Sequence, residues 1–256
     1  MSEKSYTPGR VVWRELMTRD VAKARAFYGE LFGWRFEEVD MGPMGKYTMV
    51  HAGAKPIGGL WPKPEGDPRP SAWMSYVSVE DVDQASEQAK AQGGQIMYGP
   101  ADIPNVGRFA LLSDPGGAVF LAFRSAEGDP PAGMPGLHEF CWETISAPDV
   151  AQAEGFYDHL FGWKSMPSPA PGGKVFSVDG TPQGMVADVY PAKAEVPPHW
   201  LTYVAVEKLE TSTERAAKLG AQVPMPKIEI PNIGYSAFVV DPEGAALGLF
   251  QPLVQG

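Results

Sequence analysis

Two amphipathic helical patterns with nearly the same residues lie about half a chain apart. Residues 20–34 read DVAKARAFYGELFGW, and residues 149–163 read DVAQAEGFYDHLFGW. Apolar positions at helical spacing form one face of the first copy, namely Val21, Ala24, Phe27, Tyr28 and Leu31. The leading Asp of each copy suits an N-cap, and Gly33 and Gly162 suit a helix stop. The pattern predicts two matching helices, each with a buried face rich in aromatic residues.

Strand patterns surround these helices. Runs of strand character precede four helix starts, at Val11–Thr18, Trp73–Val79, Cys141–Ala147 and Trp200–Val206. The string D-V-x-x-A opens a helix at Asp20, Asp81 and Asp149, and a degraded version begins at Lys208. Three more strand candidates follow each helix, separated by turns rich in Gly and Pro. We therefore expect four βαβββ modules of about 50 residues each.

The two halves of the chain align with few insertions. Trp73–Val79 and Trp200–Val206 are 127 residues apart, and the turns that begin at Asp114 and Asp241 are separated by the same 127. Pro and Gly dominate residues 126–136, the expected linker. The predicted fold class is α+β, with four βαβββ modules paired into two tandem domains with curved mixed β-sheets, at residues 8–125 and 137–253. A ligand is expected on the concave side of such a sheet.

Composition narrows the class of partner. The 256 residues carry a formal net charge of −10, which offers no basic surface for a nucleic acid. The single cysteine, Cys141, excludes an intrachain disulfide and favours a reducing compartment. No apolar window reaches the roughly 18–20 residues that a membrane span needs. We expect a cytoplasmic protein without nucleic-acid or membrane partners, and a monomer or weak homodimer, since the tandem copies pair within one chain.

The motifs FYxxLFGW and DPxG, each present twice, resemble the vicinal oxygen chelate superfamily. This superfamily includes glyoxalase I, bleomycin resistance proteins and extradiol dioxygenases. The phrases at Trp13–Asp20 and Pro197–Trp200 are similar to those of tandem two-domain glyoxalase-like proteins of soil bacteria, some of them named hydroxylases. The resemblance covers nearly the whole chain and implies a divalent metal held by His, Glu or Gln on inward strand faces.

The positions that the resemblance assigns to metal ligands carry other residues here. Counting from the helix-capping Asp and from DPxG places them at Trp13, Trp142, Met74, Leu201, Leu121 and Gly248. Divalent transition metals prefer imidazole, carboxylate or thiolate ligands, which none of the six supplies. We therefore expect no cofactor, and a divalent metal is disfavoured.

The candidate ligand-binding residues are those expected on the inward strand faces: Trp13, Glu15, Met74, Tyr76, Leu121, Trp142, Thr144, His199, Leu201 and Tyr203. Glu15 is either a solvated rim residue or a buried carboxylate able to act as a base. Its repeat mate is Thr144, so the two halves should differ chemically. His199 is either structural or part of the second cavity. The paired tyrosines, Tyr76 and Tyr203, either offer hydroxyls to a ligand or fill the core.

Two functions follow from these residues. The first is a glyoxalase- or bleomycin-resistance-like protein that binds a small aromatic or cationic molecule in a concave cavity without the usual metal. The alternative is an enzyme of the same superfamily: a glyoxalase-type lyase, a dioxygenase or hydroxylase, or a metal-independent isomerase that uses Glu15. A third possibility is a scaffold whose cavities are filled by side chains.

Overall fold

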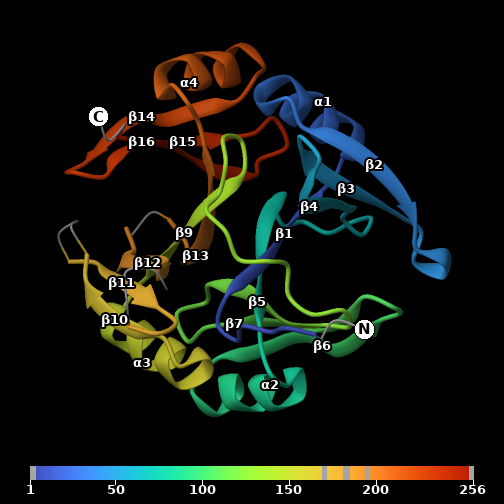
Figure 1. Cartoon of the computed structure of the whole chain (residues 1–256), viewed down its shortest axis with the longest axis vertical. Coiled ribbons are helices and arrows are strands. Elements are labelled where there is room, and N and C mark those ends of the chain that lie inside the picture. The colour runs from blue at the N-terminus through green and yellow to red at the C-terminus, as the bar shows by residue number, and fades with distance from the viewer. Residues whose placement is uncertain (1–3, 169–171, 181–184, 194–195, 254–256) are drawn as a thin grey trace. The chain divides into compact units, whose positions relative to one another are not determined.

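The computed structural model describes residues 4–168, 172–180, 185–193 and 196–253 (Figure 1). These residues form four βαβββ modules, as predicted. Module 1 contains β1 (Val11–Thr18), α1 (Val21–Phe32), β2 (Arg35–Asp40), β3 (Lys46–Ala52) and β4 (Lys55–Pro62). Module 2 contains β5 (Ala72–Ser78), α2 (Val82–Ala91), β6 (Gln95–Ile103), β7 (Gly107–Ser113) and β8 (Val119–Ser125).

Modules 3 and 4 repeat this order. Module 3 contains β9 (Phe140–Ala147), α3 (Val150–Phe161), β10 (Lys164–Pro167), β11 (Lys174–Ser177) and β12 (Met185–Pro191). Module 4 contains β13 (His199–Ala205), α4 (Leu209–Lys218), β14 (Gln222–Ile230), β15 (Gly234–Val240) and β16 (Ala246–Pro252). The α+β class and the four modules are confirmed.

Each half of the chain supplies one eight-stranded mixed sheet. The strand orders are β2-β3-β4-β1-β5-β8-β7-β6 and β10-β11-β12-β9-β13-β16-β15-β14. In every module the first and last strands pair in parallel, while the hairpin strands pair antiparallel. The predicted domain limits at 8–125 and 137–253 remain a prediction, because the chain also divides in another way, described next.

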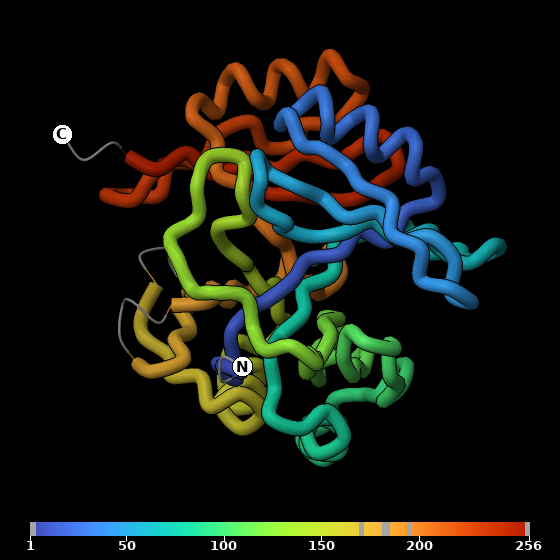
Figure 2. Tube along the Cα trace, turned by 45° about the vertical axis from the view of Figure 1, so that its right-hand side comes forward, coloured from blue at the N-terminus to red at the C-terminus, as the bar shows by residue number. Residues whose placement is uncertain are grey.

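The compact units do not follow the halves. Unit 1 comprises Met1–Trp13, Ser75–Gly133 and Glu143–Trp200, so it is built mainly from modules 2 and 3. Unit 2 comprises Arg14–Met74, Met134–Trp142 and Leu201–Gly256, so it is built mainly from modules 1 and 4. Within unit 2, α1 and α4 lie side by side in both views (Figures 1 and 2). A helix from one half therefore packs beside a helix from the other.

The predicted helix ends are confirmed. The Asp20 carboxylate accepts a hydrogen bond from the Lys23 amide at 3.0 Å, and Asp149 caps α3 in the same way. Gly33 and Gly162 end their helices in the left-handed conformation, both at φ 70°. Such a φ strains residues with a side chain, so glycine suits this position. Within the described residues, no helix is long and apolar enough to span a membrane.

A buried chain of hydrogen bonds links the two repeated motifs in each unit. In unit 2 the Trp73 indole donates to the Tyr28 hydroxyl at 2.9 Å, and this hydroxyl donates to the Asp241 carboxylate at 2.9 Å. In unit 1, Trp200, Tyr157 and Asp114 repeat the chain at the same distances of 2.9 Å. Each tyrosine comes from the FYxxLFGW helix of one half, and each aspartate comes from the DPxG turn of the other. The motifs therefore join the halves.

The final Trp of each FYxxLFGW motif adds a second link between the halves. The Trp163 indole donates to the Gly9 carbonyl at 2.9 Å, and the Trp34 indole donates to the His138 carbonyl at 2.7 Å. A Cβ on Gly9 would lie 2.9 Å from the Trp163 nitrogen, and Gly9 also has a φ of 86°. Trp73 and Trp200 are buried in the core.

Removing one tyrosine hydroxyl from these chains should destabilise the protein measurably. Tyr28→Phe leaves the buried Trp73 nitrogen and Asp241 oxygen without this partner, at an expected cost of about 1–3 kcal/mol in the free energy of unfolding. Tyr157→Phe should have a similar effect in unit 1. Denaturant unfolding measures both. Tyr98→Phe is the matched control, since Tyr98 is 59% exposed. Equal stability of Tyr28→Phe and this control would contradict the structural role.

The buried aspartates should make stability depend on pH in an unusual direction. Burial raises the pKa of the Asp114 and Asp241 carboxyls above the ordinary value of 3.8, and outweighs the hydrogen bonds that lower it. The folded protein then holds the proton more tightly than the unfolded chain. This stabilisation is complete below the ordinary pKa and is lost as pH rises through the folded pKa. Relative to Asp241→Asn, the wild type should gain stability on acidification. Identical pH profiles of unfolding for both proteins would argue against this.

Candidate ligand-binding faces

The strand register defines one equivalent position in all four modules, which we call the central pair. It joins the first strand of each module to the last, on the face opposite the helix. The four pairs are Glu15 with Gly59, Tyr76 with Leu121, Thr144 with Asp188, and Tyr203 with Gly248. The following residue on each first strand is fully buried in the core: Leu16, Val77, Ile145 and Val204. The helix-side faces are thus alike, while the central pairs differ in all four modules.

Tyrosines fill the central positions of modules 2 and 4. Tyr76 is 5% exposed and meets the Phe123 ring edge to face at 5.5 Å. Tyr203 is 6% exposed and lies across Gly248, where any side chain would collide with its ring. Of the two roles left open by the sequence, this burial favours filling of the face. Leu121 and Leu201 are buried as well.

Module 1 combines a carboxylate with an aromatic pair. Glu15 is half-buried on β1 opposite Gly59, and the Tyr47 ring lies over this glycine. The Tyr47 and Trp61 rings are 5.6 Å apart with an interplanar angle of 40°, and both are half-buried. A carboxylate and two π faces on one sheet surface suit a flat or cationic ligand.

The equivalent face of module 3 carries more polar side chains than that of module 1. Asp188 is half-buried on β12, opposite Thr144, and accepts a short hydrogen bond from the Tyr190 hydroxyl. The Ser168 hydroxyl lies 3.2 Å from that of Tyr190, whose ring lies over Gly173. Burial, followed by the negative charge of Asp188, raises the pKa of the Tyr190 hydroxyl. Tyr190 therefore remains a protonated donor to Asp188 in neutral solution.

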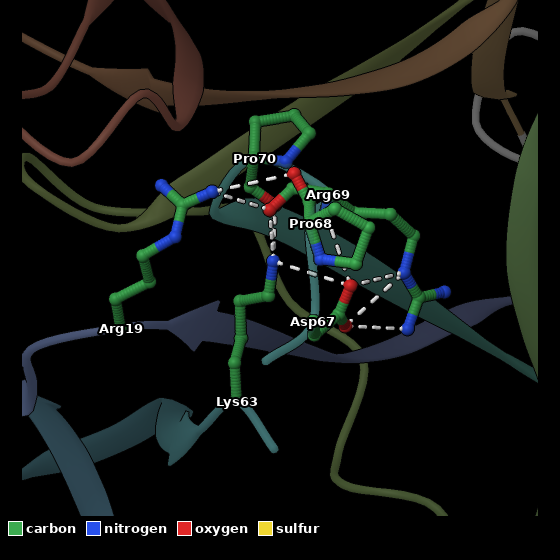
Figure 3. Close-up of polar contacts among 6 residues, drawn as sticks. All are labelled: Arg19, Lys63, Asp67, Pro68, Arg69 and Pro70. Atoms are coloured by element: carbon green, nitrogen blue, oxygen red, sulfur yellow. Dashed lines mark hydrogen bonds and ion pairs between the residues drawn. The ribbon is translucent and has the colours of Figure 1, made fainter. Parts of the chain in front are cut away.

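The loop after Trp61 is held by two cations (Figure 3). The Lys63 side chain is only 3% exposed, and its ammonium donates to the carbonyls of Arg69 and Pro70 and lies 3.7 Å from the Asp67 carboxylate. The Arg19 guanidinium donates to the Arg69 carbonyl at 2.8 Å. Hydrogen bonds from Arg69 hold the pKa of the Asp67 carboxyl well below its usual range. The loop is thus fixed at the strand end that carries Trp61.

The remaining sequence candidates are distributed along the first strands. Trp13 on β1, Trp142 on β9 and Met74 on β5 are half-buried. His199 begins β13, and its Nδ1 donates to the Pro197 carbonyl at 2.7 Å, a local contact that favours the structural role.

The donor set does not fit the divalent metal that the resemblance implies. Trp13, Met74, Leu121, Trp142, Leu201 and Gly248 offer no imidazole or carboxylate. Across the part of the chain that the structure describes, no group of three or more His, Cys, Asp or Glu side chains could hold a metal ion. Asp188 occupies the last-strand central position of module 3, but it is one carboxylate among non-ligands.

Sequence reasoning missed four residues of these faces: Tyr47, Trp61, Asp188 and Tyr190. The signal was available in the repeat, because Asp188 and Tyr190 lie 129 residues after Gly59 and Trp61, the same offset as the two helices. Module 3 lacks the DPxG turn that was used for counting. A fifth group, Glu143, was also missed. It is fully buried on β9 and accepts a hydrogen bond from the Ser75 hydroxyl at 2.9 Å.

Removing the buried ammonium should loosen the loop beside Trp61. In Lys63→Met the carbonyls of Arg69 and Pro70 lose a donor, so amide hydrogen exchange across residues 63–71 should accelerate by about tenfold or more. Lys46→Met, at a lysine that is 74% exposed in the same module, is the control and should leave this exchange unchanged. Unaltered exchange in Lys63→Met would show that the loop is held by other contacts.

Comparison with known proteins concerns the family and the fold of the chain. Residues 10–121 match the model of the Glyoxalase/Bleomycin resistance protein/Dioxygenase superfamily. "Putative glyoxylase CFP32" of Mycobacterium bovis is 29% identical to this chain, over 98% of this chain and 97% of its own length. "Anthracycline biosynthesis protein DauV" of Streptomyces sp. (strain C5) is 28% identical over 96% of this chain and 94% of its own.

Solved structures share the fold at low sequence identity. The Mn(II)-bound glyoxalase from Novosphingobium aromaticivorans has a TM-score of 0.63 at 14% identity, over 97% of this chain and 83% of that one. The 2,3-dioxygenase LapB from Pseudomonas sp. KL28 has a TM-score of 0.63 at 12% identity, over 96% of this chain and 93% of that one. The second half repeats the element order of the matched first half. Residues 10–121 therefore match the glyoxalase/bleomycin resistance protein/dioxygenase superfamily, and the whole chain shares the fold of these solved structures.

Proposed function

We propose that this protein binds a small aromatic or cationic molecule on the module 1 face, without the divalent metal usual in that superfamily. One observation carries the proposal: the half-buried Tyr47 and Trp61 rings, 5.6 Å apart, beside the central Glu15. The rings offer stacking surface to a flat ligand, and the carboxylate offers charge pairing to a cationic one. The net charge of −10 favours the approach of a cation.

Two further observations support the proposal. The six superfamily ligand positions hold Trp, Met, Leu and Gly, so binding would depend on contacts other than metal coordination. Two of the relatives are named for anthracycline biosynthesis and match this chain over 96% of its length. Anthracyclines contain fused aromatic rings, which suit an aromatic wall.

An enzyme is the second candidate, and Glu15 is the observation that favours it. A half-buried carboxylate beside a glycine and two aromatic rings could act as a base in a metal-independent isomerisation. This second proposal includes a lyase and an oxygenase. One relative is named as a glyoxylase, and structural neighbours are named as dioxygenases. The cytoplasmic location and the monomeric or weakly dimeric state remain predictions.

Binding of a flat aromatic compound tests the first candidate. A set of anthracyclines and simple aromatic amines, titrated into metal-free protein, should quench tryptophan fluorescence saturably. Trp61→Ala should weaken binding by about tenfold or more, because a stacking wall is lost. Tyr235→Ala, which removes a half-buried ring on β15 outside module 1, is the control. Elemental analysis showing one tightly held metal ion per half would contradict the proposal, as would unchanged affinity in Trp61→Ala.

Substitution of Glu15 separates the two candidates. If Glu15 pairs with a cation, Glu15→Gln should weaken binding of aromatic amines and leave neutral aromatics unaffected. If Glu15 is a catalytic base, Glu15→Gln should abolish turnover of a substrate found by screening. Glu37→Gln, 69% exposed in the same module, is the matched control. Turnover of the methylglyoxal–glutathione adduct that is lost with EDTA would instead favour a metal-dependent lyase.

A further inference from the structure

We infer that module 3 carries a second binding site, built on Asp188 and Tyr190, for a ligand that presents an ammonium group. This site is separate from the module 1 face and does not depend on the function proposed there. Asp188, Tyr190, Thr144 and Ser168 all belong to unit 1, whereas Glu15, Tyr47 and Trp61 belong to unit 2.

The four central pairs differ in whether they contain a carboxylate. Modules 2 and 4 place tyrosines there that are 5% and 6% exposed. Modules 1 and 3 instead place a carboxylate there, Glu15 on the first strand of one and Asp188 on the last strand of the other. Both residues are half-buried, and Oδ1 of Asp188 is itself buried. Module 3 is therefore the second face that offers an anionic group to a ligand.

The groups around Asp188 suit a cation with hydrogen-bond donors. The Tyr190 hydroxyl donates to Oδ2 of Asp188, and its raised pKa keeps it protonated. The carboxylate thus remains the acceptor of the pair, and Asp188 lies opposite Thr144 in the strand register. An ammonium has three donors and no acceptor, which matches a carboxylate and a hydroxyl.

The position of the Tyr190 ring is fixed by its neighbours. It lies over Gly173, where any side chain would collide with it, and its hydroxyl lies 3.2 Å from that of Ser168. A fixed phenol beside a carboxylate presents a π face next to a negative charge, and cations favour both. On β12 a carboxylate, Asp188, precedes a tyrosine, Tyr190, by two residues. The last strands of the other modules do not contain this pair.

Two probes that differ by an amino group test the charge requirement. Tyramine carries an ammonium, while 4-ethylphenol is its neutral analogue. In amide NMR spectra of the full-length protein, tyramine should shift the signals of Thr144, Asp188 and Tyr190, and 4-ethylphenol should bind there about tenfold more weakly or worse. The signals of Tyr47 and Trp61 report module 1 separately, so failure of one site is distinguishable from failure of the other.

Two variants assign the effect to the carboxylate. Asp188→Asn should weaken tyramine binding by about tenfold or more and leave 4-ethylphenol unchanged. Tyr190→Phe keeps the ring over Gly173 and should retain tyramine binding. Asp158→Asn, 49% exposed in the same module, is the control. If Asp188→Asn does not fold, tyramine binding to the wild type is measured at raised salt instead. Salt screens charge pairing, so it should weaken the binding of tyramine more than that of 4-ethylphenol.

Four outcomes would overturn the inference. In the first, tyramine leaves the three module 3 signals unshifted; in the second, it binds there no more tightly than 4-ethylphenol. In the third, tyramine binds Asp188→Asn as tightly as the wild type. Shifts of the same signals by Mg²⁺ or Zn²⁺, reversed by EDTA, would show a metal site in place of an ammonium site.

Discussion

The buried chain from tryptophan through tyrosine to aspartate is the constraint on which this architecture depends. An indole N–H only donates, a carboxylate only accepts, and the tyrosine hydroxyl between them does both. All three groups are buried, so each must find its partner inside the protein. Tyr28 finds Asp241 at a separation of 213 residues, because the helix of one half reaches the turn of the other. Tyr157 and Asp114 make the reciprocal contact, so the two halves are joined twice by the same chemistry.

These hydrogen bonds between the halves leave the residues on the opposite strand faces free to differ between modules. The helix-side positions that follow the central pairs are all apolar and fully buried: Leu16, Val77, Ile145 and Val204. The central positions one residue earlier are Glu15, Tyr76, Thr144 and Tyr203. Because successive strand residues point to opposite faces, one face can maintain the packing while the other changes its chemistry. The duplicated helix motif is thus a structural element, and functional differences belong to the other surface.

Local signals explain what the sequence could predict. The Asp caps, the glycine stops and the four modules depend on local spacing, and all agree with the structure. The exchange of Tyr28 and Tyr157 between halves could not be predicted, since no local pattern encodes a partner in the other half of the chain. The faces were predicted in part. Glu15 and Thr144 were found by counting from a helix, but Asp188 requires the strand register of a module whose last turn lacks DPxG.

The position of one glycine decides which strand can carry the carboxylate. A tyrosine ring that lies flat on a sheet needs a neighbour without a side chain. In module 1 this neighbour is Gly59, the central residue of the last strand, so Tyr47 covers that position and the carboxylate is on the first strand, as Glu15. In module 3 the covering ring is Tyr190 and the glycine beneath it is Gly173, outside the central pair. The last-strand position is then open to a side chain, and Asp188 occupies it. The asymmetry between the two faces therefore follows from where the aromatic ring lies, and both faces keep one carboxylate beside one tyrosine.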